Sequence, residues 1–338
     1  MGILQVVVDG VDSVKLTEVD APQATSDDVI VKVEQCGICG SDLGYISMGG
    51  LLGPGVPMRL GHELSGTVVE AGSNVSHVAV GDRVIVNPVA NSNQIGNGGP
   101  EGGFTPLLHV RGAAQDEQGV IKLPDTLDFE QGALVEPLAV SMHAVHKASL
   151  TAQDRVVVFG AGPIGLGIVL VARYYGVDDI VVVDLSEQRL KTASQLGAAP
   201  FKASEGDLPQ FLSERWGSRD VMGMPMPAAD AFFEATGAGP VFNQIVNMAP
   251  VNARVVVVGV HKAPVEFDLV NLLLRELQVS GSMAYPDEFS QVIEMLASGK
   301  VDPSPLVSHR YDLSEFPDAL AMARDQAQAL KVLVACQR

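Results

Sequence analysis

Residues 156–165 have the sequence VVVFGAGPIG, and this stretch decides the fold of the middle of the chain. A run of β-branched residues predicts a buried strand, and three glycines follow it with the spacing G-x-G-x-x-G. In such a loop the first glycine permits a tight turn, the second lets the backbone approach a pyrophosphate, and the third lets the next helix pack on its strand. A lone glycine motif of this kind is also compatible with a plain tight turn. If the loop holds a dinucleotide, the expected contacts are Gly160, Gly162, Pro163, Ile164 and Gly165.

The next apolar strand supports the dinucleotide interpretation. It ends in Asp184, at the distance where a carboxylate accepts hydrogen bonds from the adenosine ribose hydroxyls. A carboxylate there repels a 2′-phosphate, so the sequence favours NAD over NADP. Arg189 is available to cover the adenine or its ribose, and Val258 ends a further strand as another expected cofactor contact.

Strand and helix patterns divide the chain into two regions. Apolar strands alternate with helix-length segments from residue 154 onward, which predicts parallel β-structure with crossover helices. Before them, short β-branched runs are broken by turn residues, a pattern typical of an antiparallel or barrel-like β domain. We therefore predict an α/β protein in which residues 151–278 form a doubly wound Rossmann domain. Residues 1–150 and 279–338 form the second domain, to which the last strand, KVLVA, returns.

Composition narrows the class of protein and its partners. The length of 338 residues favours two domains, and 47% hydrophobic against 18% charged residues suits an α/β enzyme. The formal net charge of −18 disfavours nucleic acid and anionic membranes as partners. No apolar run has the length of a membrane span and the first residues lack a secretory pattern, so we expect a cytoplasmic protein.

The cysteine pattern points to a metal site. Cys36, Cys39 and Cys336 cannot make a disulfide framework. C-x-x-C spacing is compatible with a structural zinc pair or a redox pair, but the chain has no second cysteine pair. A metal would then use three protein groups and keep one position open, with His62, Glu63 and Glu136 offering an imidazole and carboxylates. Each residue also has a plain structural alternative, as a core cysteine, a core histidine or a carboxylate at a helix N-terminus.

Several motifs, in order along the chain, resemble the medium-chain zinc-dependent alcohol dehydrogenases. They are CGICGSD, LGHELSGTVVEAG, GDRV, EPLAV, GAGPIG, EATG and SGSMAYPDEFSQVIEMLASGK. Within that family the chain is most similar to the branch of sorbitol, L-idonate and (R,R)-2,3-butanediol dehydrogenases. The resemblance implies a GroES-like catalytic domain beside the Rossmann domain, an active site in the cleft between them, and a homodimer or homotetramer.

By this resemblance, Cys39 and His62 are ligands of a catalytic zinc. Glu136 is the third ligand or the carboxylate that holds a zinc-bound water, and Glu63 enters the coordination shell during turnover. Asp42 orients His62, and Ser41 relays the alcohol proton, although Ser41 also fits a simple turn. Zinc suits the reaction because it lowers the pKa of a bound alcohol without redox chemistry of its own.

The chain departs from the family at several positions. Residues 88–104, where most relatives carry four cysteines and a structural zinc, contain no cysteine, so we predict one zinc per subunit. Gly44 stands where many family members have a histidine that ends the proton relay. The alcohol proton would then leave through water, His77 or His143. Ala284 replaces an arginine that grips a polyol hydroxyl, which favours a substrate smaller or less polar than a hexitol. The expected substrate-lining residues, which fit a domain interface equally well, are Tyr45 and Tyr285.

The predicted function is an NAD-dependent zinc oxidoreductase that acts on a secondary alcohol or a vicinal diol such as 2,3-butanediol. A polyol dehydrogenase similar to the L-idonate and sorbitol enzymes is the alternative. A metal-free reductase similar to the quinone oxidoreductases is a less favoured alternative. Such reductases do not have the set of possible metal ligands that this chain has in Cys39, His62 and Glu136. A catalytically inactive nucleotide-binding structural protein of the same fold is the rival from another class.

Overall fold

The computed structural model describes residues 2–51, 53 and 55–337, and the chain divides into two compact units. Unit 1 comprises Met1–Glu136 and Val307–Arg338, and unit 2 comprises Pro137–Leu306. The sequence predicts borders at 150/151 and 278/279. The difference lies in helices at both ends of the strand-rich segment, which the sequence patterns assign to the other domain and which the contacts place mainly in unit 2.

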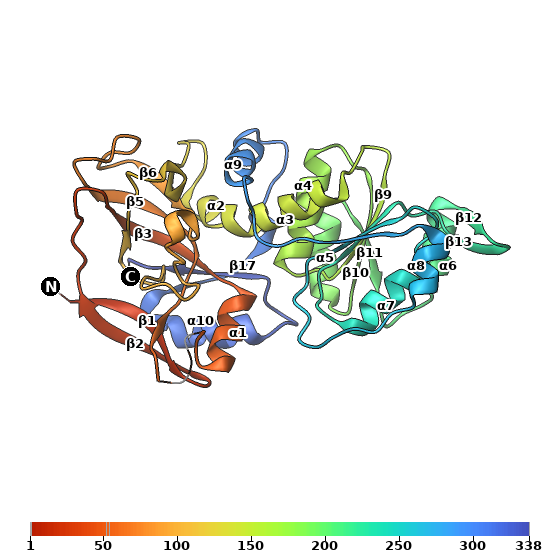
Figure 1. Ribbon diagram of the computed structural model, residues 1–338, viewed down its shortest axis with the longest axis horizontal. Helices are drawn as coiled ribbons and strands as arrows, with labels where there is room; N and C mark the ends of the chain where they lie inside the picture. Colours follow the sequence, from red (N-terminus) through yellow and green to blue (C-terminus); the bar gives the residue numbers. More distant parts are fainter. Residues whose placement is uncertain (1, 52, 54, 338) are drawn as a thin grey trace. The chain divides into compact units, whose positions relative to one another are not determined.

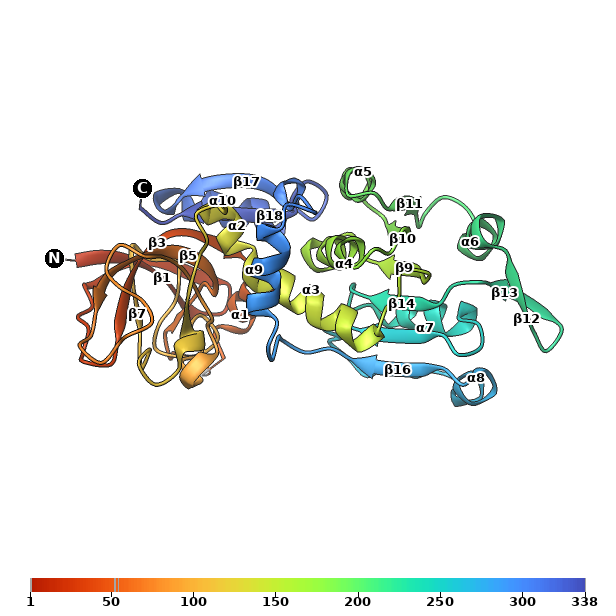
Figure 2. The same cartoon turned by 90° about the horizontal axis from the view of Figure 1, so that it is seen from above.

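Unit 2 is built on a six-stranded parallel sheet with the order β11-β10-β9-β14-β15-β16. Numbered along the chain, this is the order 3-2-1-4-5-6 of a doubly wound dinucleotide-binding sheet, which confirms the predicted Rossmann fold. Figure 2 shows the strands following one another from β11 to β16. The strands are β9 (Arg155–Phe159), β10 (Asp179–Asp184), β11 (Ala199–Lys202), β14 (Ala231–Glu234), β15 (Arg254–Val257) and β16 (Gln278–Gly281).

Apolar helices and central strands share one core in unit 2, so the strands are near-continuous runs of valine and phenylalanine. The helices are α3 (Val135–Ala148), α4 (Pro163–Tyr174), α5 (Glu187–Gln195), α6 (Leu208–Trp216), α7 (Gly239–Met248), α8 (Leu269–Arg275) and α9 (Phe289–Ala297). A two-stranded hairpin of β12 (Ser218–Val221) and β13 (Met224–Pro227) follows α6 and was not apparent from the sequence.

Unit 1 contains two β-sheets and short helices (Figure 1). The larger sheet has the order β17-β18-β3-β5-β6-β8, with β7 also paired to β3, and the smaller has the order β2-β1-β4. The elements are β1 (Gly2–Gly10), β2 (Ser13–Asp20), β3 (Val29–Ile38), α1 (Gly40–Met48), β4 (Met58–Arg59), β5 (Glu63–Ala71), β6 (Arg83–Val86), β7 (Leu107–Val110), β8 (Val120–Lys122), α2 (Phe129–Ala133), β17 (Val307–Asp312), α10 (Phe316–Arg324) and β18 (Lys331–Ala335).

The end of the chain returns to unit 1, as the sequence predicts. Strand β18 pairs antiparallel with β3, with Val332 opposite Ile38 and Val334 opposite Cys36. This register places Lys331 beside the turn that leads from β3 into α1. Among the described residues, no helix is both long and apolar enough to span a bilayer.

The cysteine-free loop, residues 88–104, is ordered by apolar and ionic contacts. Ile95 and Phe104 are fully buried, and Phe104 contacts the Phe316 ring edge-on at a centroid distance of 4.9 Å. Glu101 accepts hydrogen bonds from Arg59 at 2.6 Å and Arg111 at 2.7 Å. Side-chain packing and ion pairs with the rest of unit 1 therefore hold the loop in place.

The buried carboxylate of Asp28 lies beside this network and makes the free energy of unfolding depend on pH. Asp28 accepts hydrogen bonds from Gly112 N at 2.9 Å and Thr25 N at 3.1 Å, and its Oδ2 lies 2.9 Å from His109 Nε2. Burial alone would raise the pKa of Asp28, but these hydrogen bonds outweigh it and lower the pKa well below the ordinary value. The folded state therefore holds this proton less tightly than the unfolded state.

We expect Asp28→Asn to lower the free energy of unfolding by about 1–3 kcal/mol at pH 7, because one of the two acceptor oxygens becomes an NH2 group and a buried donor loses its acceptor. The stability that Asp28 contributes is complete well above its unfolded pKa of 3.8 and is lost progressively as the pH falls from about 5 through that value. The variant should consequently show a shallower loss of stability between pH 6 and pH 3 in urea titrations. The control is Asp27→Asn, which alters the adjacent, half-buried carboxylate. Equal acid slopes for wild type and Asp28→Asn would contradict this assignment.

Candidate active site

Local backbone structure places the first candidate ligand at the start of a helix. Strand β3 ends at Ile38, and Cys39 is the N-cap of α1 with φ −96° and ψ 156°. The N–H of Cys39 donates to Oδ2 of Asp42 at 2.8 Å, which closes the turn. The spacing of Cys39, Ser41 and Asp42 is thus fixed by one helical turn.

A glycine in the left-handed region places the second and third candidate ligands. Gly61 has φ +96°, and an added Cβ there would lie 2.7 Å from the Phe104 nitrogen. The chain then passes through His62 into β5, which begins at Glu63. Donor atoms of Cys39, His62 and Glu63 lie within 4.8 Å of one another, and this is the one such group of three in the described part of the chain. We name these three residues the ligand cluster.

The charges around the ligand cluster fit a divalent cation. Asp42 and Glu63 are each 1% exposed and His62 is 3% exposed. Burial opposes a charged His62, but the negative charges of Asp42, Cys39 and Glu136 outweigh it and raise the pKa of His62 well above its ordinary value. An excess of buried anionic groups, together with thiolate, imidazole and carboxylate donors, is what a zinc ion requires.

Two buried polar atoms also lack hydrogen bonds among the described residues. They are Nδ1 of His62 and Oδ1 of Asp42, which lie 3.6 Å apart. A metal on the other ring nitrogen, Nε2, leaves the proton on Nδ1, where it can point to the carboxylate of Asp42. Zinc would be held by Cys39 and His62 in this arrangement, with a carboxylate from Glu63 or Glu136.

A buried lysine that sequence patterns did not indicate contacts the ligand cluster. Nζ of Lys331 lies 2.6 Å and 2.5 Å from the two carboxylate oxygens of Glu63, and it donates to the Ile38 carbonyl at 3.2 Å. Lys331 is 2% exposed, and although burial lowers its pKa, the charge of Glu63 raises it overall. The only available signal was a lysine opening the apolar strand KVLVA, where a partner of opposite charge is needed.

Of the remaining candidates, Ser41 lies closest to the cluster, with its Oγ 3.3 Å from Nε2 of His62. Glu136, in the first turn of α3, is buried at 8% exposure, and its charge raises the pKa values of His62 and Lys331. Glu136 is not in the ligand cluster, whereas Glu63 is. Their roles as ligands stay predictions.

The dinucleotide loop of unit 2 has the geometry that its glycines predict. Gly160 has φ +100°, and a Cβ added to Gly165 would lie 1.8 Å from the Gly160 carbonyl oxygen. A Cβ added to Gly162 would meet only Nη1 of Arg189 within 4 Å, at 3.9 Å. Open space above Gly162, at the N-terminus of the 12-residue helix α4, fits a pyrophosphate group.

Other predicted cofactor and substrate residues also lie in unit 2. Asp184 ends β10, and its carboxylate accepts hydrogen bonds from Ala161 N and Ser186 N, both at 2.7 Å. Val258 directly follows β15 and donates its N–H to the Glu234 carbonyl at 2.9 Å. The Tyr285 ring packs against Phe289 at a centroid distance of 5.0 Å. Cofactor contacts and substrate contacts at these positions stay predictions.

The suggested histidines of the exit path have other surroundings. His143 Nδ1 lies 2.7 Å from Oε1 of Glu288, and His146 Nδ1 lies 3.3 Å from the same oxygen. Among the described residues, no hydrogen bond joins His143 or His77 to Ser41. Neither histidine therefore gains support as a partner of the serine.

A buried acid at the carboxyl edge of the parallel sheet was also missed. Glu234 is fully buried, accepts from Thr236 N at 2.8 Å and Gly237 N at 3.0 Å, and lies 2.9 Å from Nε2 of His261. This carboxylate fixes the loops after β14 and β15. Those loops border the edge where ligands of such sheets bind.

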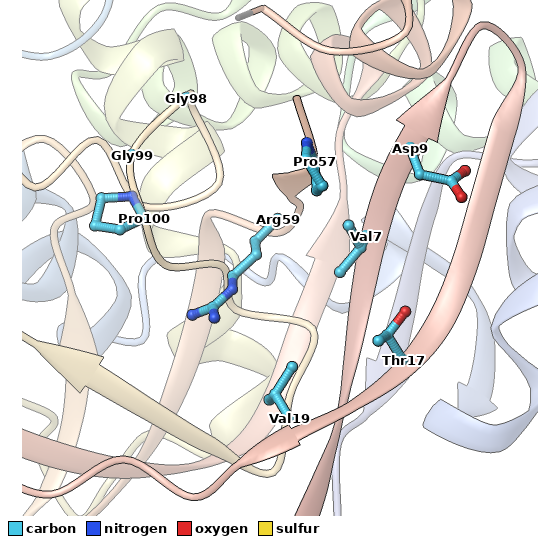
Figure 3. Close-up of a pocket in the computed structure, with 9 residues that line it drawn as sticks. All are labelled: Val7, Asp9, Thr17, Val19, Pro57, Arg59, Gly98, Gly99 and Pro100. Carbon is cyan, nitrogen blue, oxygen red and sulfur yellow. The ribbon is translucent and has the colours of Figure 1, made fainter. Parts of the chain in front are cut away.

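Unit 1 has an open surface groove with a volume of about 630 Å³. Figure 3 shows the residues that line it. Val7, Asp9 and Thr17 line one side, and Gly98–Pro100 lies opposite. Its lining contains no member of the ligand cluster, so the groove is not assigned to the substrate.

Comparison with known proteins agrees with these features. Residues 25–148 match the alcohol dehydrogenase GroES-like domain family, and residues 163–298 match the zinc-binding dehydrogenase family. The chain is 32% identical to (R,R)-butanediol dehydrogenase of Bacillus subtilis over 95% of this chain and 96% of that one. It is 33% identical to sorbitol dehydrogenase of Bos taurus, covering 98% of this chain and 96% of that one.

A solved structure is similar throughout. The crystal structure of 2R,3R-butanediol dehydrogenase from Bacillus subtilis aligns with a TM-score of 0.87 at 31% identity, covering 98% of this chain and 99% of that one. Family and fold therefore agree with the resemblance seen in the sequence. The chain belongs to the zinc-dependent medium-chain alcohol dehydrogenases, oxidoreductases that transfer a hydride between an alcohol and a nicotinamide cofactor.

Proposed function

We propose that this enzyme interconverts a vicinal diol, or a secondary alcohol of similar size, and its ketone with NAD, using one zinc ion held at the ligand cluster. The convergence of Cys39, His62 and Glu63 within 4.8 Å carries the proposal. The relatives act, by their names, on butanediol and on sorbitol, so a polyol is the near-equal alternative. Ala284, in place of an arginine expected in sorbitol enzymes, favours the smaller diol.

The protein groups have distinct tasks in this proposal. Zinc, when bound, lowers the pKa of an alcohol so that its proton can leave near neutral pH. Cys39 and His62 bind the ion, and Asp42 orients His62 through Nδ1. Oγ of Ser41 takes up the alcohol proton and passes it onward as a general acid–base relay. The buried setting of the cluster strengthens each of these electrostatic interactions.

The substrate proposal is tested by following NADH formation with short diols, monohydric secondary alcohols, pentitols and hexitols. We expect the highest kcat/KM with 2,3-butanediol. Activity confined to hexitols would overturn the diol assignment and support the polyol alternative. Metal analysis of the same preparation should give about one zinc per chain, since four cysteines are absent from residues 88–104.

We further propose that NAD is the cofactor. The carboxylate of Asp184 already accepts two backbone hydrogen bonds and adds negative charge where a 2′-phosphate would lie. Arg189 lies beside Gly162 and near Asp184, so its positive charge would attract the phosphates of a bound dinucleotide.

Asp184→Ser should weaken NADH binding roughly 10-fold or more and narrow the preference for NAD over NADP, because a charge-assisted hydrogen bond is lost and the repulsion removed. Dissociation constants from NADH and NADPH fluorescence measure both effects. Zinc content should stay at the wild-type value, because Asp184 belongs to unit 2 and the ligand cluster belongs to unit 1. Unchanged cofactor preference would contradict the assigned role of Asp184.

A homodimer is the assembly that we propose. Apolar side chains are exposed on and around α8 and the edge strand β16, at Val260, Leu269, Leu273, Val279 and Met283. An edge strand with one unpaired side, next to a helix with exposed apolar side chains, is suited to a symmetric contact with a second copy. Light scattering that gives a monomer mass at micromolar concentration would overturn this.

The three free thiols suit a reducing compartment, in line with the expected cytoplasmic location.

A further inference from the structure

A hydrogen bond connects the cysteine-free loop to the helix that carries Ser41. The phenol of Tyr45 donates to Oδ1 of Asn97 at 3.1 Å, across 52 residues of sequence. Tyr45 follows Ser41 by four residues on α1, so both side chains lie on one face of that helix. Ser41 in turn lies 3.3 Å from Nε2 of His62, so the helix that contacts Asn97 through Tyr45 also carries a neighbour of the ligand cluster.

Close backbone packing fixes the loop at this place. A Cβ added to Gly96 would lie 2.2 Å from the carbonyl oxygen of Gly61, the residue before His62. The Gly96 N–H donates to the Glu101 carbonyl at 2.8 Å, which closes the loop just after Asn97. Asn97 is therefore held next to the ligand cluster by contacts independent of its own side chain.

Electrostatics also place the phenol of Tyr45 at the site. Burial raises the pKa of Tyr45, and the charges of Asp42, Cys39 and Glu136 raise it further. The phenol accordingly stays protonated at neutral pH and acts as the donor to Asn97. With Oδ1 occupied in this way, the amide of Asn97 has its two Nδ2 protons left for other acceptors. No described residue accepts a hydrogen bond from that nitrogen.

We propose that Asn97 is a specificity-determining residue, whose Nδ2 donates a hydrogen bond to the second oxygen of a vicinal diol or hydroxyketone. This inference rests on the proposed function, because it assigns the group that recognises the neighbouring hydroxyl. In this proposal the reacting oxygen binds at the metal site, and the second oxygen, one carbon away, accepts a hydrogen bond from the amide that Tyr45 orients. A monohydric alcohol leaves the amide without an acceptor, so binding energy is lost.

The first test compares 2,3-butanediol with 2-butanol in the zinc-loaded enzyme. Asn97→Leu, which keeps the size and removes the polar atoms, should lower kcat/KM for the diol by about 10- to 100-fold. For 2-butanol the change should be less than about 3-fold, because no hydrogen bond to Asn97 exists to be lost. Tyr45→Phe frees the amide from its orientation and should give a smaller loss, again confined to the diol.

The second test measures binding without turnover. Pinacol has two tertiary hydroxyls and no hydride to transfer, and 2,3-dimethyl-2-butanol lacks one of those hydroxyls. In calorimetric titrations of the zinc-loaded, NAD-bound enzyme, wild type should bind pinacol about 10-fold more tightly than the monohydric compound. Asn97→Leu should bind the two compounds with nearly equal affinity.

The control is Asn74→Leu, since Asn74 is an exposed asparagine of the same unit whose amide donates to Asp27 at 2.6 Å. This variant should leave the zinc content and the kcat/KM values for 2,3-butanediol and 2-butanol unchanged. Equal losses on diol and monohydric alcohol in Asn97→Leu, or loss of zinc from that variant, would overturn the specificity role and assign a structural one. A wild-type enzyme that oxidises no alcohol of the panel contradicts the proposed function itself, whereas the pinacol titration still decides whether Asn97 recognises a second hydroxyl.

Discussion

Cys39→Ala and His62→Ala are each expected to abolish zinc binding and to lower kcat/KM by roughly 1,000-fold or more. The metal contributes several kcal/mol of charge stabilisation in such reactions, and each 1.36 kcal/mol corresponds to a factor of ten. Two of the three members of the ligand cluster are the thiolate and the imidazole, and a carboxylate alone does not hold zinc tightly. Metal content by atomic emission and steady-state NADH formation measure the two effects.

Cys36→Ala is the matched control for the cysteine. Cys36 is also in the C-x-x-C pair, but it is fully buried in β3, and burial raises the pKa of its thiol well above the ordinary value. A protonated core thiol is a poor metal ligand, so zinc content and turnover should persist in this variant. Retention of zinc in Cys39→Ala, or its loss only in Cys36→Ala, would show that the wrong cysteine has been assigned.

Lys331→Met should lower the free energy of unfolding by about 3–5 kcal/mol, the typical effect of removing one partner from a buried ion pair. The carboxylate of Glu63 is 1% exposed and bonded by both oxygens to Nζ of Lys331, so it would lose its counter-charge inside the core. Urea unfolding is best followed on both zinc-free and zinc-loaded protein, because bound zinc itself stabilises the native state.

Two further variants separate the buried charge from loss of packing. Glu63→Gln combined with Lys331→Met removes both charges and should recover much of the lost stability in zinc-free protein. Lys15→Met breaks the exposed ion pair between Lys15 and Asp9 and should leave the free energy of unfolding nearly unchanged, because solvent screens exposed charges. If the double variant is as unstable as Lys331→Met alone, the uncompensated charge of Glu63 is not the cause.

The sequence alone was sufficient where short-range geometry decides the structure. Gly160 and Gly165 adopt the turn and the close packing that their spacing predicts, because both depend on backbone within a few residues. The doubly wound sheet and the returning C-terminal strand followed from apolar periodicity, which records burial directly.

Tertiary structure alone decided the contacts between distant residues. Lys331 meets Glu63 across 268 positions because the register of β18 on β3 places it there, and no local pattern encodes that register. Asn97 reaches Tyr45 only because the loop backbone at Gly96 packs against Gly61. Local sequence determined which backbone shapes this protein can adopt, whereas the pairing of strands and loops decided which charged and polar side chains meet, since that pairing depends on the packing of the whole unit.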